Sequence, residues 1–249
     1  MNYMVFDLEF NQVFTFNKEH PRVSHLRCPF EIVQIGAVKL DENLNEIGTF
    51  DRLVKPKLYT RIHPYVKKMT GITREDLKTA QPFKSVYKEF IEFINNVSVL
   101  CVFGTSDIKE LLRNIEYHKL DTSPIPKEYM DVQHYANTHL KHPKGTSISL
   151  SNAAAALDIP SQLKFHNALN DALYTAEVFK KIFNRQMKPD IYHLHKDRKA
   201  NKGSSKKTTL DADRLMKQFE RMFHREMTSE EQTIIKLAYQ MGNTNQFER

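Results

Sequence analysis

The amino-acid sequence predicts an α/β domain with a mixed sheet flanked by helices, followed by a small helical segment at the C-terminal end. Three short apolar runs of strand character follow one another closely near the N-terminus, which is typical of an antiparallel meander. Runs of strand and helix character then alternate, which is typical of parallel strand pairing. A basic stretch poor in apolar residues separates this region from the last part of the chain.

Five runs are predicted to be strands because they are short, apolar and bounded by polar or turn-forming residues. They are Tyr3–Asp7, Ile32–Leu40, Ile47–Val54, Val97–Phe103 and Tyr129–Val132. The polar turn at residues 41–43 joins the second run to the third, so these two should form a hairpin.

Four segments are predicted to be helical because their apolar residues recur at helical spacing or follow a capping residue. They are a stretch within Leu77–Asn96 that carries Phe83, Val86, Tyr87, Phe90, Ile91 and Ile94, and then Ser106–Tyr117, Ser149–Leu157 and Ala168–Phe183. The aromatic residues of the first segment are expected to lie in the core.

The sequence indicates three parts, namely a domain over residues 1–188, a basic linker over 189–208 and a helical segment over 209–249. Pro189 ends the pattern of the domain, and KDRKANKGSSKK over Lys196–Lys207 is typical of a linker.

Two amphipathic helices are expected in the last segment, at Leu210–Arg225 and Ser229–Met241. Thr228 and Glu231 have the spacing of a capping box at the start of the second one. A helical hairpin is the simplest structure for this segment, and nothing in it indicates which protein partner, if any, it binds.

Composition limits the functional class. The chain has 249 residues, of which 40 % are hydrophobic and 27 % charged, so it can bury a sizeable core. No apolar run approaches the ~18–20 residues that span a bilayer, and the first residues do not resemble a secretory signal. Cys28 and Cys101 are too few for a disulfide framework, so a cytoplasmic location is expected. The net charge of +7 permits a polyanionic partner such as nucleic acid.

Acidic residues stand where predicted strands end or predicted helices begin. Asp7 and Glu9 are two residues apart in an extended run, so both carboxylates should point to the same side. Asp107 opens a predicted helix beyond a buried strand, where its role is either to cap the helix or to bind a ligand. His166 and Asp171 bracket the start of another helix. Each feature alone is also common in proteins without catalytic activity.

Taken together, these residues resemble a known family, the DEDDh 3′→5′ exonucleases, which have a ribonuclease-H-like fold. The resemblance covers residues 3–185. Its three motifs are FDLEF at Phe6–Phe10, FGTSD at Phe103–Asp107 and HNALNDA at His166–Ala172, with supporting similarity at Glu31–Ala37 and Thr70–Leu77. Within the family, the chain looks closest to the subgroup that contains the histone-mRNA 3′-end exonuclease, although Phe103 stands where that subgroup usually has Trp.

The resemblance implies a catalytic site of four carboxylates and one histidine. Asp7 would bridge two metal ions, Glu9, Asp107 and Asp171 would complete the metal site, and His166 would accept a proton from the attacking water. Oxygen ligands favour Mg²⁺ or Mn²⁺ over zinc, and cations relieve the repulsion between the acids. The implied reaction removes nucleoside monophosphates from the free 3′ end of a strand.

Substrate binding is expected from residues next to these acids. In the family, the connection that corresponds to Met69, Thr70, Gly71 and Ile72 contacts the terminal bases. Phe10 follows the first motif directly, where its role is either to contact the terminal nucleotide or to pack in the core. The expected partners are the 3′ ends of single-stranded RNA or DNA, and the subgroup favours RNA. Basic side chains between positions 52 and 78 can meet phosphates, but a solvated surface is the simpler interpretation for at least half of them.

Two other functions stay open at this point. A DNA exonuclease of the proofreading or repair type would carry the same residues, because the choice between RNA and DNA depends on recognition of the 2′-hydroxyl group. A non-catalytic nucleic-acid-binding module with the same fold would normally have lost one or more acids. This chain has all five expected site residues, which favours an enzyme.

Overall fold

The computed structural model of the chain describes residues 2–13, 25, 27–143, 145–193, 216, 220, 225–232 and 235. The chain divides into two compact units, Met1–Leu194 and His195–Arg249. All of the residues expected to form the catalytic site lie in the first unit. Within the part of the chain that the structure describes, no helix is both long and apolar enough to cross a membrane.

One seven-stranded sheet forms the centre of the first unit, with the strand order β4-β3-β2-β1-β5-β6-β7. The strands are β1 (Asn2–Gln12), β2 (Phe30–Leu40), β3 (Glu46–Lys55), β4 (Gln81–Pro82), β5 (Val97–Val102), β6 (Glu128–Asp131) and β7 (Asp190–Ile191). β1, β2 and β3 form an antiparallel meander, whereas β5 lies parallel to β1 and β6 parallel to β5. This mixed sheet confirms the predicted fold class.

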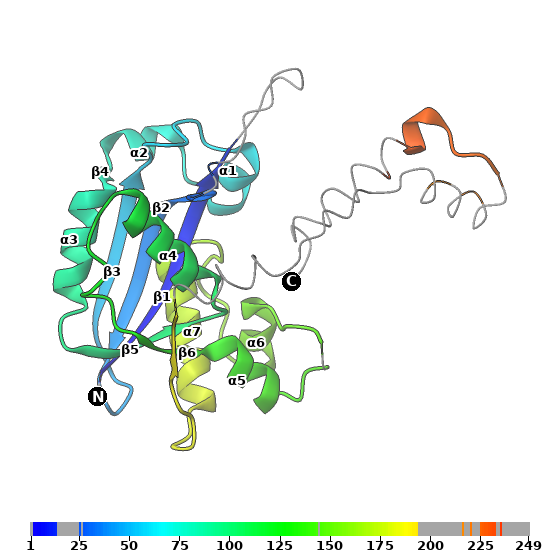
Figure 1. Cartoon of the computed structure of the whole chain (residues 1–249). Helices are drawn as coiled ribbons and strands as arrows, with labels where there is room; N and C mark the ends of the chain where they lie inside the picture. Colours follow the sequence, from blue (N-terminus) through cyan, green and yellow to red (C-terminus); the bar gives the residue numbers. More distant parts are fainter. Residues whose placement is uncertain are drawn as a thin grey trace. The chain divides into compact units, whose positions relative to one another are not determined.

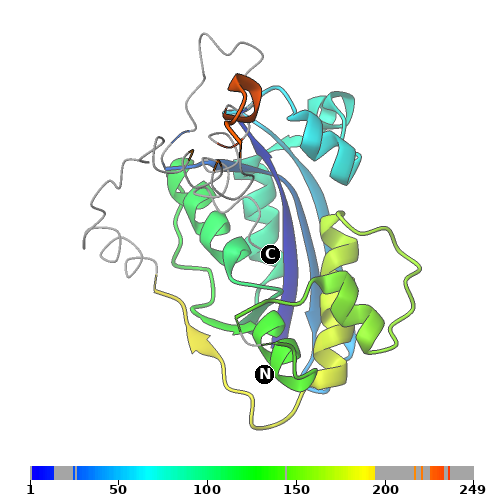
Figure 2. The same cartoon turned by 90° about the vertical axis from the view of Figure 1, so that its right-hand side faces the viewer.

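Helices cover both faces of the sheet (Figures 1 and 2). The helices are α1 (Pro64–Thr70), α2 (Arg74–Thr79), α3 (Phe83–Phe93), α4 (Ser106–Tyr117), α5 (Val132–His139), α6 (Leu150–Ala156) and α7 (Ala168–Ile182). α3 and α4 build one apolar core against the sheet, and α5, α6 and α7 build the other. Aromatic residues of α3, including Phe83 and Phe90, are buried as expected.

The structure differs from the predicted elements in two places that matter for function. β1 continues to Gln12 instead of ending at Asp7, because its pairing with β2 extends to Gln12 opposite Phe30. β7 lies inside the segment expected as a linker, because Asp190 and Ile191 pair with β6. The first acidic pair therefore lies within a paired strand, and the sheet extends beyond residue 188.

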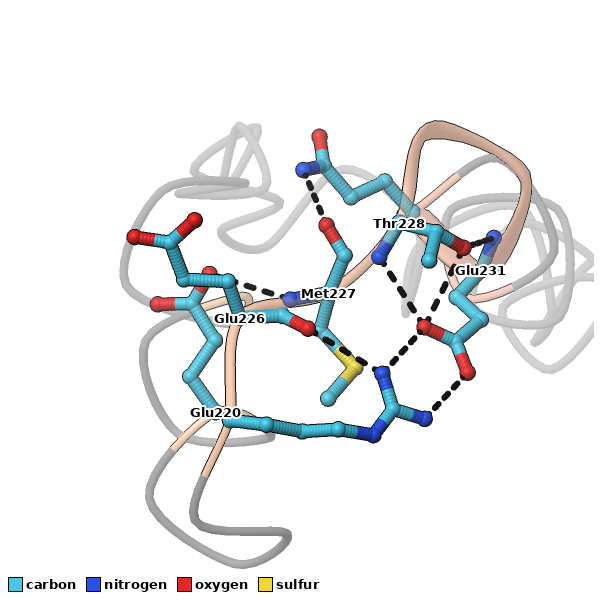
Figure 3. A network of polar contacts seen from close by, with 7 residues as sticks. Glu220, Glu226, Met227, Thr228 and Glu231 are labelled. Carbon is cyan, nitrogen blue, oxygen red and sulfur yellow. Dashed lines mark hydrogen bonds and ion pairs between the residues drawn. The ribbon is translucent and has the colours of Figure 1, made fainter.

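The second unit is described at only a few positions, and most of the two helices expected there lie outside the described residues. Residues 229–232 and 235 are helical. The main-chain N–H of Thr228 donates to Glu231 Oε2 at 2.9 Å, and the main-chain N–H of Glu231 donates to Thr228 Oγ1 at 3.3 Å, which is the expected capping box (Figure 3). Arg225 adds two hydrogen bonds to the Glu231 carboxylate.

Candidate active site

The alternation of side chains along β1 places two carboxylates on one face of the sheet. Tyr3 and Val5 pack into the core that contains α7, whereas Leu8 packs into the core that contains α3 and α4. Asp7 and Glu9 continue the series of Tyr3 and Val5, so both face the α7 side. The pairing of β1 with β2 shifts register between Glu9 and Phe10, and the regular alternation ends there.

The other two acids of the site lie at the starts of two helices. Asp107 lies in the first turn of α4 and Asp171 in the first turn of α7, and both are buried. His166 precedes α7, is exposed, and has a left-handed backbone with φ of 63°. Its main-chain N–H donates to Asp171 Oδ2 at 3.0 Å, and the Asn167 side chain caps the helix. The backbone turn at His166 thereby directs its side chain and that of Asp171 toward the same site.

The structure brings the expected catalytic residues together. One ligating atom each of Glu9, His166 and Asp171 lie within 4.8 Å of one another. Glu9 and Asp171 are close enough to Asp7 and Asp107 for their negative charges to raise the pKa values of both. Residues separated by more than 160 positions in the chain thus meet on one face of β1.

Burial and mutual repulsion make these carboxyl groups hard to ionise without cations. Burial first, and then the negative charges of Asp107, Asp171 and Glu9, hold the pKa of Asp7 well above its ordinary value of 3.8. Burial and the charge of Asp171 raise the pKa of Glu9 to about 8. Burial raises the pKa of Asp171 to about 6, although the hydrogen bond and the charge of His166 lower it.

The donor set fits divalent cations. The acids offer only oxygen ligands, which Mg²⁺ and Mn²⁺ prefer. Asp171 Oδ1 is buried and has no hydrogen-bond partner among the described residues, although buried polar atoms are normally paired. A cation at this place would supply the missing partner and offset the repulsion between the acids.

Two residues of β2 hold the start of α7 in place. Gly36 lies opposite Asp7, and a Cβ atom on it would lie 2.1 Å from main-chain atoms of Ala168 and Leu169. Gln34 is buried and accepts a hydrogen bond from the main-chain N–H of Ala168 at 3.2 Å. No role was expected for either residue, although Gln34 is a polar residue within the mostly apolar run of β2.

Three of the five residues expected to bind substrate line one groove, and Phe10 packs against the core that contains α3 and α4. Phe10 is half-buried, with its ring centroid 6.2 Å from that of Phe30. Thr70 and Gly71 end α1, with Gly71 at φ of 79°, and Ile72 is buried. These last three residues line a groove of about 350 Å³. Met69 is half-buried and is not among the residues that line the groove.

Without metal, the domain is expected to lose stability as the pH rises. The pKa of Glu9 is about 8 in the folded chain against an ordinary value of 4.5. A carboxyl with a raised pKa in the folded state stabilises the fold fully below the unfolded value, and this contribution is lost as the pH rises through the folded value. The melting temperature in EDTA should therefore fall by roughly 5 °C between about pH 5 and about pH 8.5.

Thermal melts at constant ionic strength measure this effect. Saturating Mg²⁺ should flatten the pH dependence, because cations neutralise the same carboxylates. Glu9→Gln is the matched variant, and it should lose much of the slope in EDTA. A parent chain whose melting temperature in EDTA does not change over this range would contradict the prediction.

Comparison with known protein families gives one match over most of the chain. A family model described as Exonuclease matches residues 4–179. This range contains the five residues of the carboxylate and histidine site.

Comparison with curated proteins finds relatives among polymerases and nucleases. The chain is 27 % identical over 191 residues to the DNA polymerase III PolC-type of Caldanaerobacter subterraneus. This match covers 74 % of this chain and 12 % of that protein. The chain is 22 % identical over 180 residues to the 3′-5′ exonuclease crn-4 of Caenorhabditis elegans. This match covers 67 % of this chain and 60 % of that protein. The chain thus spans only a small part of the length of the polymerase.

Comparison with solved structures finds the same fold. A structure that describes 3′-end-specific recognition of a histone mRNA stem-loop by a 3′-exonuclease has a TM-score of 0.65 at 18 % identity, over 77 % of this chain and 68 % of that one. The nuclease domain of 3′hExo, a DEDDh family member, has a TM-score of 0.63 at 19 % identity, over 77 % of this chain and 96 % of that one. At these identities, the similarities show that the fold is shared.

Proposed function

Because the chain belongs to the exonuclease family whose model matches residues 4–179, we propose that it is a metal-dependent 3′→5′ exonuclease that acts on single-stranded RNA. The observation that carries this proposal is the convergence of Glu9, His166 and Asp171 within 4.8 Å, beside two further buried or half-buried acids. A fold alone would not imply an activity, whereas a complete set of reactive groups in one place does.

Asp7, Glu9, Asp107 and Asp171 would hold the cations. When bound, two divalent ions supply positive charge that lowers the pKa of water and stabilises the developing charge on the phosphate and the leaving oxygen. The acids repel an unaccompanied phosphate, so nucleic acid should bind productively only when cations are present. This explains why a site for a polyanion is built from negative side chains.

His166 would take the proton of the attacking water. A neutral imidazole can accept a proton, and the exposed position of His166 allows it to pass the proton to solvent. Water adds to phosphorus, the bond from phosphorus to the 3′-oxygen of the preceding nucleotide breaks, and that oxygen gains a proton from solvent. The products are a nucleoside 5′-monophosphate and a strand that is one nucleotide shorter and ends in a 3′-hydroxyl group.

RNA is the first candidate substrate because the sequence resembles the histone-mRNA subgroup, and structures of 3′-exonucleases share its fold. DNA is the second candidate because one relative over 74 % of this chain is a DNA polymerase III. A DNA exonuclease would use the same catalytic residues, so the two candidates differ only in the groups that contact the sugar.

A time course on matched RNA and DNA oligonucleotides with a 5′ label tests the proposal. We expect a ladder that shortens from the 3′ end with Mg²⁺ or Mn²⁺ and stops in EDTA. Asp171→Asn and His166→Ala should each slow the reaction by about a hundredfold or more, because each removes one member of the catalytic set. The ratio of the RNA rate to the DNA rate identifies the preferred substrate.

The matched control is His142→Ala, since His142 lies outside the cluster and should leave the rate unchanged. Strong RNA binding without shortening of any strand, in either metal, would contradict the enzymatic proposal. It would favour the nucleic-acid-binding module instead.

A further inference from the structure

The loop that carries His166 lies on the surface, between α6 and α7. Leu163, Lys164 and His166 are exposed, and Phe165 is half-buried. His166 has a left-handed backbone with φ of 63°, a conformation that residues with a Cβ atom adopt only rarely. A surface loop with little buried apolar area and an unfavourable backbone angle needs further contacts to stay in one conformation.

Two polar side chains of α7 hold the main chain of this loop just before His166. The Tyr174 hydroxyl group donates to Leu163 O at 2.8 Å and accepts from the main-chain N–H of Leu163 at 2.8 Å. Asn170 Nδ2 donates to Lys164 O at 2.8 Å. Asn170 and Tyr174 are four positions apart, so both side chains lie on the same side of α7. The helix therefore holds two consecutive residues of the loop by their backbone.

The ring of Tyr174 holds the next residue of the loop. The rings of Phe165 and Tyr174 are stacked, with centroids 4.4 Å apart and planes inclined by 20°. Tyr174 is 3 % exposed and belongs to the core that contains α7. A side chain fixed in the core thus holds Leu163 by its hydroxyl group and Phe165 by its ring.

These contacts decide where the imidazole of His166 stands. The main-chain N–H of His166 donates to Asp171 Oδ2 at 3.0 Å. Asp171 is also expected to hold a cation, so contacts at residues 163–165 keep the loop in place whether or not the metal is bound. The placement is important, because a shift of about 1 Å in a reacting group can cost about a hundredfold in rate.

We propose that Tyr174 is a positioning residue that, together with Asn170, keeps His166 within reach of the water that it deprotonates. The inference rests on the proposed function, in which His166 accepts that proton. The Tyr174 hydroxyl group is engaged with Leu163, so its effect on the reaction passes through the loop.

Tyr174→Phe is the decisive variant, because it keeps the stacked ring and removes only the hydroxyl group. The variant would be compared with the parent in single-turnover assays on the strand that the parent shortens faster. We expect the rate at saturating strand and Mg²⁺ to fall by about tenfold. The strand and Mg²⁺ concentrations at half-maximal rate should each change by less than about twofold, because the acids keep their places.

A double-mutant cycle with His166→Ala separates positioning from a general loss of structure. A residue that acts through His166 has nothing to act on in that background, so Tyr174→Phe should slow His166→Ala by less than about twofold. Asn170→Ala leaves the core untouched and should show the same pattern, with a loss of about threefold in the parent. Equal slowing of the parent and His166→Ala by Tyr174→Phe would overturn the inference, as would a Tyr174→Phe chain with the parental rate.

Tyr135→Phe is the matched control. The Tyr135 hydroxyl group also pairs with both main-chain groups of one residue, since it donates to Lys188 O at 2.9 Å and accepts from the Lys188 N–H at 3.3 Å. Tyr135 lies on α5 and not beside the His166 loop, so its variant should keep the parental rate. A tenfold loss in this control would assign the effect to general stability and overturn the inference.

Amide hydrogen exchange tests the tether without any measurement of activity. In EDTA, Tyr174→Phe should speed exchange in the segment over residues 162–167 by about tenfold, and Tyr135→Phe should leave it unchanged. Parental exchange in Tyr174→Phe would overturn the inference. A chain that shortens no strand would contradict the proposed function, and its exchange would still show whether Tyr174 holds the loop, so the two proposals fail separately.

Discussion

Replacing Asp7 with asparagine is expected to abolish strand shortening and, at the same time, to stabilise the metal-free domain. Asparagine has nearly the same shape, so the packing of β1 should persist. It removes the charge that faces Asp107, Asp171 and Glu9, all of which disfavour ionisation of Asp7. Turnover should fall by about a thousandfold or more, because Asp7 is one of the four acids that would hold the cations. The melting temperature in EDTA at pH 8 should rise by roughly 3 °C, the effect of about 1 kcal/mol in a domain of this size.

Thermal melts and single-turnover assays on the same preparation measure both effects. Mg²⁺ should raise the melting temperature of the parent chain much more than that of the variant, because the variant has lost a ligand. Asp190→Asn, on exposed β7, is the matched control and should change neither quantity. A variant that is inactive but also less stable in EDTA would indicate that Asp7 supports the fold, and that it is not held there against repulsion.

The main sheet and its longer helices could be predicted because their patterns are strong and local. β2 is a continuous apolar run, and α4 begins and ends at the predicted residues Ser106 and Tyr117. The short helices α1, α2 and α5, with six to eight residues each, were not predicted, although α6 with seven residues was. Only their capping residues could have indicated them in the sequence. Thr73 and Asp76 form a capping box at α2, and the Asp131 side chain caps α5.

The two-residue strands depend on tertiary pairing. β4 and β7 each pair at two positions with a neighbouring strand and have no pattern of their own. β7 falls after Pro189, where the composition indicates the end of the domain. No local rule could have placed it beside β6, because the pairing partners are more than 60 positions apart.

The candidate catalytic residues could be named because their order and spacing resemble a family motif, not because any one is distinctive. Thr70, Gly71 and Ile72 were expected to bind substrate and line the groove, but its other lining residues were beyond prediction for a physical reason. Asp51 and Gln34 meet through the register of β2 and β3, and Asn167 joins them only when α7 packs on the sheet. Such cross-strand contacts change completely when a strand shifts by one residue, so sequence patterns do not specify them.

The geometry of the site makes its scaffold sensitive to substitution on β2. Gly36 lies opposite Asp7 on the face that receives the start of α7, and the helix backbone occupies the space that a side chain would need. The acids of β1 and α7 can approach each other only because β2 offers no side chain at this position. The closeness of Glu9 and Asp171 therefore depends on a residue that takes no part in the chemistry.

Replacing Gly36 with alanine should therefore lower both stability and activity. The new Cβ would lie 2.1 Å from the main chain of Ala168 and Leu169, which a side-chain rotation cannot relieve, so α7 must move away from the sheet. We expect a loss of about 3 kcal/mol in the free energy of unfolding. A displacement of Asp171 and His166 by about 1 Å should reduce turnover by about a hundredfold.

Gly48→Ala provides the control on the neighbouring strand β3. Its Cβ would meet only the ring of Phe93 at 3.4 Å, an ordinary contact, so stability and turnover should stay close to those of the parent. Urea unfolding and single-turnover rates would be measured for both variants. A Gly36→Ala chain with parental stability and rate would contradict the packing of α7 on β2. Comparison of Gly36→Ala with Asp7→Asn separates two roles. Loss of the acid removes activity and relieves electrostatic repulsion. Loss of the glycine removes activity because α7 moves away from the sheet.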